Sequence, residues 1–246
     1  MGIRKDLNMA SADIDYDNLK KRGFLKQRQE GFFVLRTRMP SSGIYTKDQL
    51  KKLAGISEKY AKGILHATVR QGLEVPFVKY EDINEVEREI ASVGIDTGTS
   101  GPRLRATTVC PGNNWCKQGL VDTFSLAARI EKELGLKCGL DLPHKFKISI
   151  SGCTNACARP QASDIGIHGH HGGQSKEIGY AVYVGGRGGR MPGPGIKLEK
   201  VYSEDEVLRV VENVVRFYKE RAKPRQRLGA LIEELGKDSF LKEVSK

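Results

Sequence analysis

The sequence has few of the residues that cross-link a chain or anchor it in a membrane. It holds 5 cysteines and 1 tryptophan among 246 residues, and aromatic residues make up 7% of it. It has no run of about 18 uninterrupted apolar residues and no apolar stretch at its start like that of a signal peptide. We therefore expect a cytoplasmic protein without a membrane span, in which thiols stay reduced and paired cysteines bind metal or do redox chemistry.

Positive charge is in excess. Lys plus Arg number 41 against 30 Asp plus Glu, which gives a formal charge of +11. Such a balance suits an anionic partner, but the basic residues are spread along the chain and few aromatics accompany them, which argues against nucleic acid. A polyanionic cofactor or a small oxyanion substrate uses the same charge.

Four of the cysteines form two close pairs. Cys110 and Cys116 enclose the turn in CPGNNWC, Cys153 and Cys157 lie in SGCTNACARP, and Cys138 stands alone. Structural zinc prefers two to four residues between paired ligands, so the first spacing suits zinc less well than a four-iron cluster, which accepts wider and unequal spacings. Spacing alone leaves three interpretations open: an iron–sulfur cluster, a zinc site, or unrelated core thiols.

Hydrophobic periodicity divides the chain into three parts. Residues 1–30 are polar and charged and predict an N-terminal tail, while 31–97 predict a small α+β sandwich and 98–246 a second domain. Within the sandwich we expect strands at 32–40 and 64–78 and helices at 45–63 and 81–94, with Thr46 as an N-cap. In the second domain we expect strands at 103–109, 145–152 and 178–186, helices at 121–135 and 203–223, the latter capped by Ser203, and a helical tail.

The histidines of HGHH have two interpretations. His168, His170 and His171 could bind a transition metal, but a polar loop is the simpler explanation of so polar a stretch, and we expect a loop there.

The cysteine-bearing stretches resemble the siroheme and [4Fe-4S] signature of the sulfite and nitrite reductase family, C-x5-C followed by C-x3-C. Other segments are similar to family segments in the same order: FFVLRTRMPSSGIYT, HATVRQGLEV, LPHKFKISISG and the Gly-rich VGGRGGRMP. The resemblance covers residues 20–200 or so. It implies an α+β chain, with a ferredoxin-like half-domain followed by an α/β domain that binds siroheme and a [4Fe-4S] cluster.

The same resemblance implies the cofactor ligands. Cys110, Cys116, Cys153 and Cys157 would hold the cluster, with Cys157 as the thiolate that bridges it to the siroheme iron, and Asn155 would lie against the macrocycle. Siroheme carries eight carboxylates, and the candidates for pairing them are Arg103, Arg105, Arg187 and Arg190.

Four further cations match the anion-facing positions of the family. Arg38 and Arg70 fall on siroheme- and substrate-facing arginines, and Lys145 and Lys147 on the paired lysines that face bound sulfite. The two lysines are two apart on a predicted strand, so both point to one face. Cations there would hold the anion and stabilise its charge as electrons arrive.

The implied activity is the six-electron reduction of sulfite to sulfide, with reduction of nitrite to ammonia by the same site as the alternative. A non-catalytic siroheme or cluster electron carrier would not need a cationic anion pocket, and a zinc- or cluster-stabilised RNA-binding protein is a third class. The large enzymes of the family carry two such units and this chain carries one, so we expect a homodimer. The sequence has no flavin or nucleotide fingerprint, so we expect electrons from a separate, ferredoxin-like donor protein.

Overall fold

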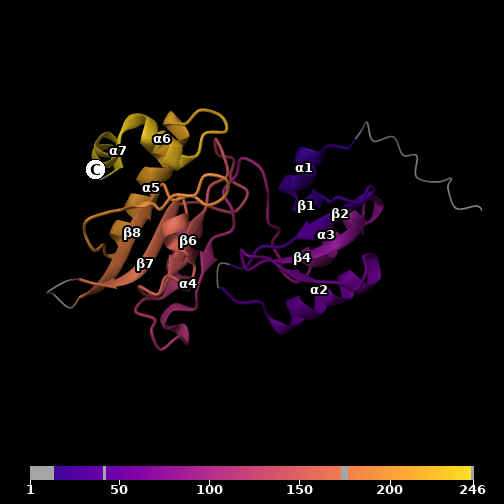
Figure 1. Cartoon of the computed structure of the whole chain (residues 1–246). Helices are drawn as coiled ribbons and strands as arrows, with labels where there is room; N and C mark the ends of the chain where they lie inside the picture. The colour runs from indigo at the N-terminus through magenta and orange to yellow at the C-terminus, as the bar shows by residue number, and fades with distance from the viewer. Residues whose placement is uncertain (1–13, 41–42, 173–176, 245–246) are drawn as a thin grey trace, which may run out of the picture. The chain divides into compact units, whose positions relative to one another are not determined.

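The chain forms two compact units (Figure 1). The computed structural model describes residues 14–40, 43–172 and 177–244. Unit 1 comprises the described residues up to Arg38 together with Tyr45–Ser100, and unit 2 comprises Met39–Ile44 and the chain from Gly101 onward. Among the described residues, no helix is both long and apolar enough to cross a lipid bilayer.

Unit 1 is built on an antiparallel sheet with the strand order β1-β2-β4-β3. Its helix α2 begins at a capping box, in which the Thr46 hydroxyl accepts from the N–H of Gln49 and the Gln49 side chain accepts from the N–H of Thr46. The predicted cap is therefore confirmed. The elements are α1 (Tyr16–Lys21), β1 (Phe24–Lys26), β2 (Phe32–Arg36), α2 (Lys47–Tyr60), β3 (His66–Ala67), β4 (Leu73–Lys79) and α3 (Ile83–Ala91), which follows the 3-10 turn Tyr80–Asp82.

The folded part of unit 1 begins earlier than the polar composition of residues 1–30 suggests. Both α1 and β1 lie in that stretch, where Leu19 is 4% exposed and Phe24 is fully buried in the core of the unit. Each element is short and contributes a single buried side chain, so neither produces a periodic pattern that a sequence window can detect.

Unit 2 is built on a mixed sheet with the order β5-β6-β7-β8-β9. The first three strands are parallel, with Val109 opposite Ile150 and Ser151 opposite His168, and β8 and β9 run antiparallel. The strands are β5 (Thr108–Val109), β6 (Ile148–Ser151), β7 (Ile165–His171), β8 (Ile178–Val184) and β9 (Ile196–Lys197). The strand expected at 103–109 is shorter than predicted, because Arg103 and Leu104 form only isolated bridges.

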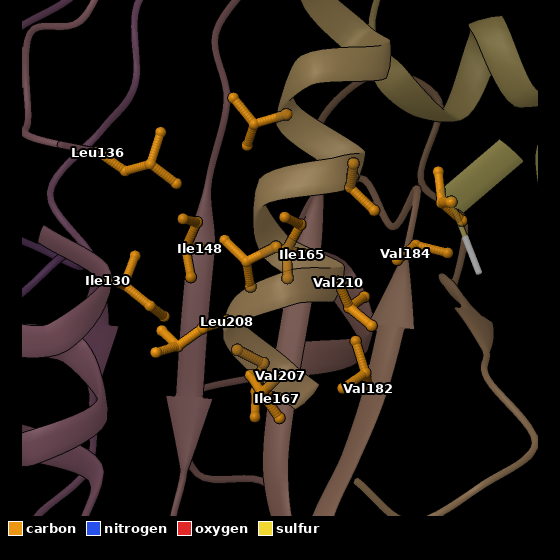
Figure 2. Packing of buried hydrophobic residues seen from close by; sticks show 14 of the residues in the cluster. Ile130, Leu136, Ile148, Ile165, Ile167, Val182, Val184, Val207, Leu208 and Val210 are labelled. Atoms are coloured by element: carbon orange, nitrogen blue, oxygen red, sulfur yellow. The ribbon is translucent and has the colours of Figure 1, made fainter. Parts of the chain in front are cut away.

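One face of this sheet packs against helices. Figure 2 shows side chains of β6, β7 and β8 turned toward residues from α4 and α5. The expected helices are confirmed as α4 (Thr123–Glu133), α5 (Glu204–Arg221), α6 (Leu228–Leu235) and α7 (Lys237–Val244), and Ser203 caps α5 through a second capping box. The buried residues labelled in the figure are Ile130, Leu136, Ile148, Ile165, Ile167, Val182, Val184, Val207, Leu208 and Val210.

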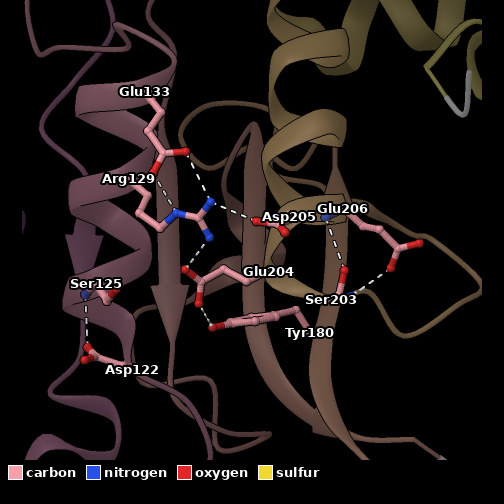
Figure 3. A network of polar contacts seen from close by, with 9 residues as sticks. All are labelled: Asp122, Ser125, Arg129, Glu133, Tyr180, Ser203, Glu204, Asp205 and Glu206. Carbon is pink, nitrogen blue, oxygen red and sulfur yellow. Dashed lines mark hydrogen bonds and ion pairs between the residues drawn. The ribbon is translucent and has the colours of Figure 1, made fainter.

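A network of charges joins α4 to α5 (Figure 3). Arg129 contacts Glu133 at 2.7 Å on its own helix and both Glu204 and Asp205 at 2.8 Å on α5. The hydroxyl of Tyr180 donates to the second oxygen of Glu204 at 3.0 Å, which adds β8 to the network. One guanidinium thus ties two helices together at the start of α5.

The second face of the sheet is polar and also covered. Ser149, Ser151 and His168 are at most 3% exposed, and the hydroxyl of Ser151 accepts from the N–H of Ala158. A Cβ on Gly166 would lie 1.9 Å from the carbonyl oxygen of Pro160, so the chain that follows β6 passes directly over this face.

The prediction of a polar loop at HGHH is wrong, because His168 and His170 lie within β7. The strand pairs with β6 and β8 on its two sides, so its backbone groups are satisfied, and alternation places His168 and His170 on the polar face and His171, the last residue of the strand, on the opposite one. No group of three or more His, Cys, Asp or Glu side chains converges as a metal-ion site within the described part of the chain.

Candidate iron–sulfur and anion site

The two cysteine loops leave the sheet at the same edge. Cys110 follows β5, Cys153 follows β6, and the two strands are parallel neighbours. The N–H of Cys110 donates to the carbonyl of Ile150 at 3.1 Å, and the N–H of Gly152 donates to Sγ of Cys110 at 3.0 Å. The carboxyl edge of the parallel strands therefore brings the first cysteine of each pair together, although they are far apart in the sequence.

The backbones of these loops approach too closely for side chains. A Cβ on Gly152 would lie 2.6 Å from Cα of Gly112, and one on Gly119 would lie 2.2 Å from the carbonyl carbon of Gly112. Gly112 itself has φ +55°, a region that glycine adopts readily. The N–H of Leu120 also donates to the carbonyl of Gly152 at 2.8 Å. The loops thus form one tightly packed support for the thiols.

The thiols of this edge suit a four-iron cluster. All five cysteines are free thiols; Cys116 and Cys157 are exposed, and Cys110 and Cys153 are half-buried. Four thiols from two loops match the donor set of a [4Fe-4S] cluster, and an N–H group already aimed at one sulfur is the kind of contact that tunes such clusters. The donor types and the side-chain-free backbone fit the predicted cluster, although among the described residues no three of these thiols converge as a metal-ion site.

Two exposed side chains are neighbours of the cysteines in the sequence, Asn155 and Trp115. Asn155, inside the second pair, is exposed, and its role against the siroheme stays a prediction. The ring of Trp115, beside Cys116, is 5.5 Å from that of Phe124 but 63% exposed, so it is only partly a packing residue.

The strand expected at 145–152 begins only at Ile148, so the paired lysines lie just before β6, on either side of Phe146, which forms an isolated bridge with Leu104. Lys145 and Lys147 are half-buried and flank Phe146, which is fully buried and has its ring 5.3 Å from that of Tyr218. Because side chains alternate along an extended chain, both ammonium groups emerge on the face opposite Phe146.

Further cations surround the start of this strand. Burial lowers the pKa of His144, and the positive charges of Arg227, Lys145, Arg105 and Arg225 lower it further. His144 therefore stays neutral among four cations at neutral pH, and this corner of unit 2 carries a positive potential suited to an anion.

The arginines assigned to siroheme carboxylates have protein partners. Arg103, 2% exposed, contacts Asp141 at 3.0 Å, and Arg105 donates to the carbonyl of Gly101. Arg187 contacts Glu233 at 2.7 Å and donates to the carbonyl of Met191, whereas Arg190 is exposed. Their pairing with a cofactor stays a prediction.

Arg38 and Arg70 lie in unit 1, at one end of its sheet. Arg38 forms an ion pair with Asp96 at 2.5 Å. Arg70 belongs to the turn between β3 and β4, and a Cβ on Gly72 of this turn would be 3.5 Å from Cα of Arg38. The turn that carries Arg70 thus passes beside the backbone of Arg38, while the lysines and the cysteines belong to unit 2.

Sequence reasoning missed one buried ion pair. Asp164 is fully buried, and both of its oxygens accept from Arg227. A signal for it was present in the sequence, because Asp164 directly precedes an apolar run. A charge in such a position is expected to be buried, and a buried charge needs a partner of opposite sign.

An antiparallel sheet with helices and a mixed sheet with two cysteine-bearing loops at one edge define an α+β protein. Residues 100–246 match the family described as "Nitrite and sulphite reductase 4Fe-4S domain", and residues 25–93 match "Nitrite/Sulfite reductase ferredoxin-like half domain". The chain belongs to the nitrite and sulfite reductase family, which confirms the resemblance and the fold class predicted from the sequence.

Relatives bear the names of both kinds of reductase. The chain is 33% identical to the coenzyme F420-dependent sulfite reductase of Methanocaldococcus jannaschii, covering 90% of this chain and 44% of the relative. It is 29% identical to the nitrite reductase [NAD(P)H] large subunit of Klebsiella oxytoca, covering 95% and 23%. It is 27% identical to the assimilatory-type sulfite reductase of Nitratidesulfovibrio vulgaris, covering 91% and 97%. The chain thus spans less than half of the first two and nearly all of the third.

Solved structures agree in fold. Dissimilatory sulfite reductase I (DsrI) superposes with a TM-score of 0.79 at 18% identity, over 87% of this chain and 69% of that one. The NirA protein of Mycobacterium tuberculosis gives 0.78 at 20% identity, over 95% and 47%.

Proposed function

We propose that this protein reduces sulfite to sulfide at a siroheme coupled to a [4Fe-4S] cluster through the thiolate of Cys157. The observation that carries the proposal is the cysteine edge of unit 2, where the N–H of Gly152 donates to Sγ of Cys110. Its support is the likeness in nearly full length to a relative named as an assimilatory-type sulfite reductase.

Each part of the site has a distinct task in this proposal. Cys110, Cys116, Cys153 and Cys157 hold the cluster, and the bound cofactors supply the electrons and the iron to which the anion binds. Reduction of hydrogensulfite takes up six electrons and six protons and yields hydrosulfide and three waters.

In this proposal the lysines stabilise the negative charge of the bound anion as it is reduced. The ammonium groups of Lys145 and Lys147 emerge on one face, where they hold the oxygens of the anion and donate hydrogen bonds to them. As each oxygen leaves as water, Nζ of a lysine is a proton source within reach of it.

Nitrite is the second candidate substrate. It is also a small oxyanion, and its reduction to ammonia takes up six electrons. One relative, matched over 95% of this chain, is named a nitrite reductase. The ratio of kcat/KM for sulfite and for nitrite, measured with one electron donor, decides between them; the higher value identifies the substrate.

We also propose a homodimer and a separate electron-donor protein. Arg38 and Arg70 of one chain would face the siroheme held by its neighbour, so that a true twofold axis replaces the pseudo-twofold of the large enzymes. Light scattering combined with turnover assays tests this, and a fully active particle with the mass of one chain contradicts it.

The test of the proposed cofactors is an absorption spectrum of anaerobically purified protein with iron and sulfide analysis of the same sample. We expect siroheme bands that change when sulfite is added to the reduced form, and about five irons per chain. The variant Cys157→Ser should lose iron and sulfide, while the matched variant Cys138→Ser should keep both. A colourless protein that contains zinc would refute the proposal.

A further inference from the structure

Asp164 is a buried carboxylate directly before β7. It is 0% exposed, and the guanidinium of Arg227 donates to its two oxygens at 2.9 and 2.8 Å. Burying a lone carboxylate is costly, and breaking such a pair leaves an uncompensated buried charge. The planar guanidinium also fixes the orientation of the carboxylate, because its donors meet both oxygens.

The same carboxylate holds the segment before β6 that carries the two lysines, called the lysine strand below. The backbone N–H of Lys147 donates to Oδ2 of Asp164 at 2.9 Å, and the N–H of Ile165 donates to the carbonyl of Lys147 at 3.1 Å. On the other side, Phe146 is fully buried in the core of unit 2. These contacts prevent the strand from rotating about its axis, so they fix the face on which the ammonium groups of Lys145 and Lys147 emerge.

Two more segments are attached to Asp164 or Arg227 by backbone contacts or along the chain. The carbonyl of Asp164 accepts from the N–H of Gly185, where the Gly-rich loop begins, at 2.8 Å, and Arg227 is the N-cap residue of α6. The N–H of Arg225 donates to the carbonyl of Pro143 at 2.9 Å, just before the lysine strand. Asp164 therefore joins three segments of unit 2, each of which carries cations.

We infer that the Asp164–Arg227 pair positions the anion site. It fixes the backbone of Lys147 and thereby the direction in which the Lys145 and Lys147 ammonium groups point. The inference rests on the proposed function and deepens it. Asp164 acts through Lys147, so it is a positioning residue and not a catalytic one. A shift of about 1 Å in catalytic groups costs on the order of a hundredfold in rate, so a second residue that fixes the lysines has a measurable effect.

The experiment compares Asp164→Ala with Asp164→Asn in the cofactor-loaded protein. Asparagine keeps an oxygen that accepts the Lys147 N–H, whereas alanine removes it. Three kinds of measurement are made on each variant: the KM and kcat for sulfite, the dissociation constant for sulfite from the change in the siroheme spectrum, and the hydrogen-exchange rate of the Lys147 amide.

For Asp164→Ala we expect KM and the dissociation constant to rise about tenfold or more, and the amide to exchange at least tenfold faster. For Asp164→Asn the KM, the dissociation constant and the exchange rate should all be closer to the wild-type values.

Arg129→Ala is the matched control. Among the described residues, the ion pairs of Arg129 are with Glu133, Glu204 and Asp205, all on α4 or α5 and none on the lysine strand. Its loss should lower stability and leave the KM for sulfite unchanged. If it raises KM as much as Asp164→Ala does, Asp164 only stabilises the fold and the inference is overturned. An unchanged KM in Asp164→Ala overturns it as well.

A second variant and a readout independent of turnover cover a misfolded Asp164→Ala and an inactive wild type. If Asp164→Ala does not fold, Arg227→Lys replaces it, since lysine keeps the charge but loses the two-pronged contact, and a smaller rise in KM is expected. If the wild-type protein reduces neither sulfite nor nitrite, the proposed function fails, and the exchange of the Lys147 amide then decides by itself whether Asp164 holds that strand.

Discussion

The backbone N–H of Gly152 points at Sγ of Cys110, at an N–S distance of 3.0 Å. The contact joins the two cysteine loops directly. It exists only because the loops pack backbone to backbone.

Gly152→Ala should therefore disrupt the cysteine edge. Its Cβ would lie 2.6 Å from Cα of Gly112, so the loops must separate and the hydrogen bond to Cys110 must lengthen. We expect iron and sulfide per chain to fall several-fold while the far-ultraviolet circular dichroism is retained. Gly55→Ala is the control: its Cβ meets nothing within 4 Å on helix α2, so it should keep the cluster and stabilise the protein by about 0.5–1 kcal/mol. Equal iron content in both variants would contradict the prediction.

The double substitution of Lys145 and Lys147 by alanine should separate cofactor binding from catalysis. The lysines are half-buried and point away from the core, so their loss should leave the cofactor spectrum intact. Loss of charge-stabilising donors from a reaction site costs on the order of a hundredfold in kcat. Lys132→Ala, an exposed residue of α4, is the control and should turn over like wild type. Steady-state assays with a reduced dye measure both, and unchanged turnover in the double variant counts against the role of the lysines.

Phe240→Ala should destabilise the C-terminal end of the fold. Phe240 on α7 is fully buried, with its ring 5.3 Å from that of Phe217 on α5. A phenylalanine removed from such a core costs about 3–5 kcal/mol. Leu235→Ala, at a site 42% exposed, should cost far less. Urea unfolding monitored by circular dichroism gives both values; a cost below about 1 kcal/mol for Phe240→Ala would mean that α7 is not firmly docked.

Acid should weaken the fold through its buried histidines. Burial lowers the pKa of His168 and of His170 below the ordinary value, whereas an unfolded histidine titrates at about 6.5. The unfolded chain therefore takes up more protons as pH falls through this value, so the stability that is present above it is lost below it.

The measurement for this prediction is the urea midpoint at pH 7.5 and at pH 5.5. We expect a lower midpoint at pH 5.5 in the wild type and a smaller difference between the two values in His168→Gln. At pH 7.5 the two proteins differ in packing and in the contacts of residue 168 with the Gly169 carbonyl and the Tyr183 hydroxyl, and this difference provides the internal control. A midpoint that stays level or rises on acidification would show that these imidazoles do not carry the pH dependence.

Local patterns predicted the elements that depend on local physics. Helix α5 begins at Ser203, as predicted, because its cap, its acidic first turn and its apolar face all lie within one stretch of sequence. The cysteine pairs were equally visible, since their spacing is itself local.

The features that sequence missed depend on distant partners. Strand β7 looks like a polar loop because the strand that pairs with it and the Tyr183 hydroxyl that contacts His168 come from β8, outside the local pattern. Arg187 pairs with Glu233 and Arg103 with Asp141, and no local pattern separates an arginine with a protein partner from one that faces a cofactor. The same holds for Asp164, whose partner Arg227 comes from the C-terminal part of the chain.

The joined cysteine loops have a consequence for folding. Cys116 and Cys153 lie at the two ends of a segment that contains α4 and β6. A group bound by both loops closes this segment into a covalent ring, as a disulfide would, and removes conformations from the unfolded chain. Loss of the proposed cluster would therefore reopen the ring and loosen a helix and a central strand of the sheet together, so the proposed redox centre would also stabilise the fold.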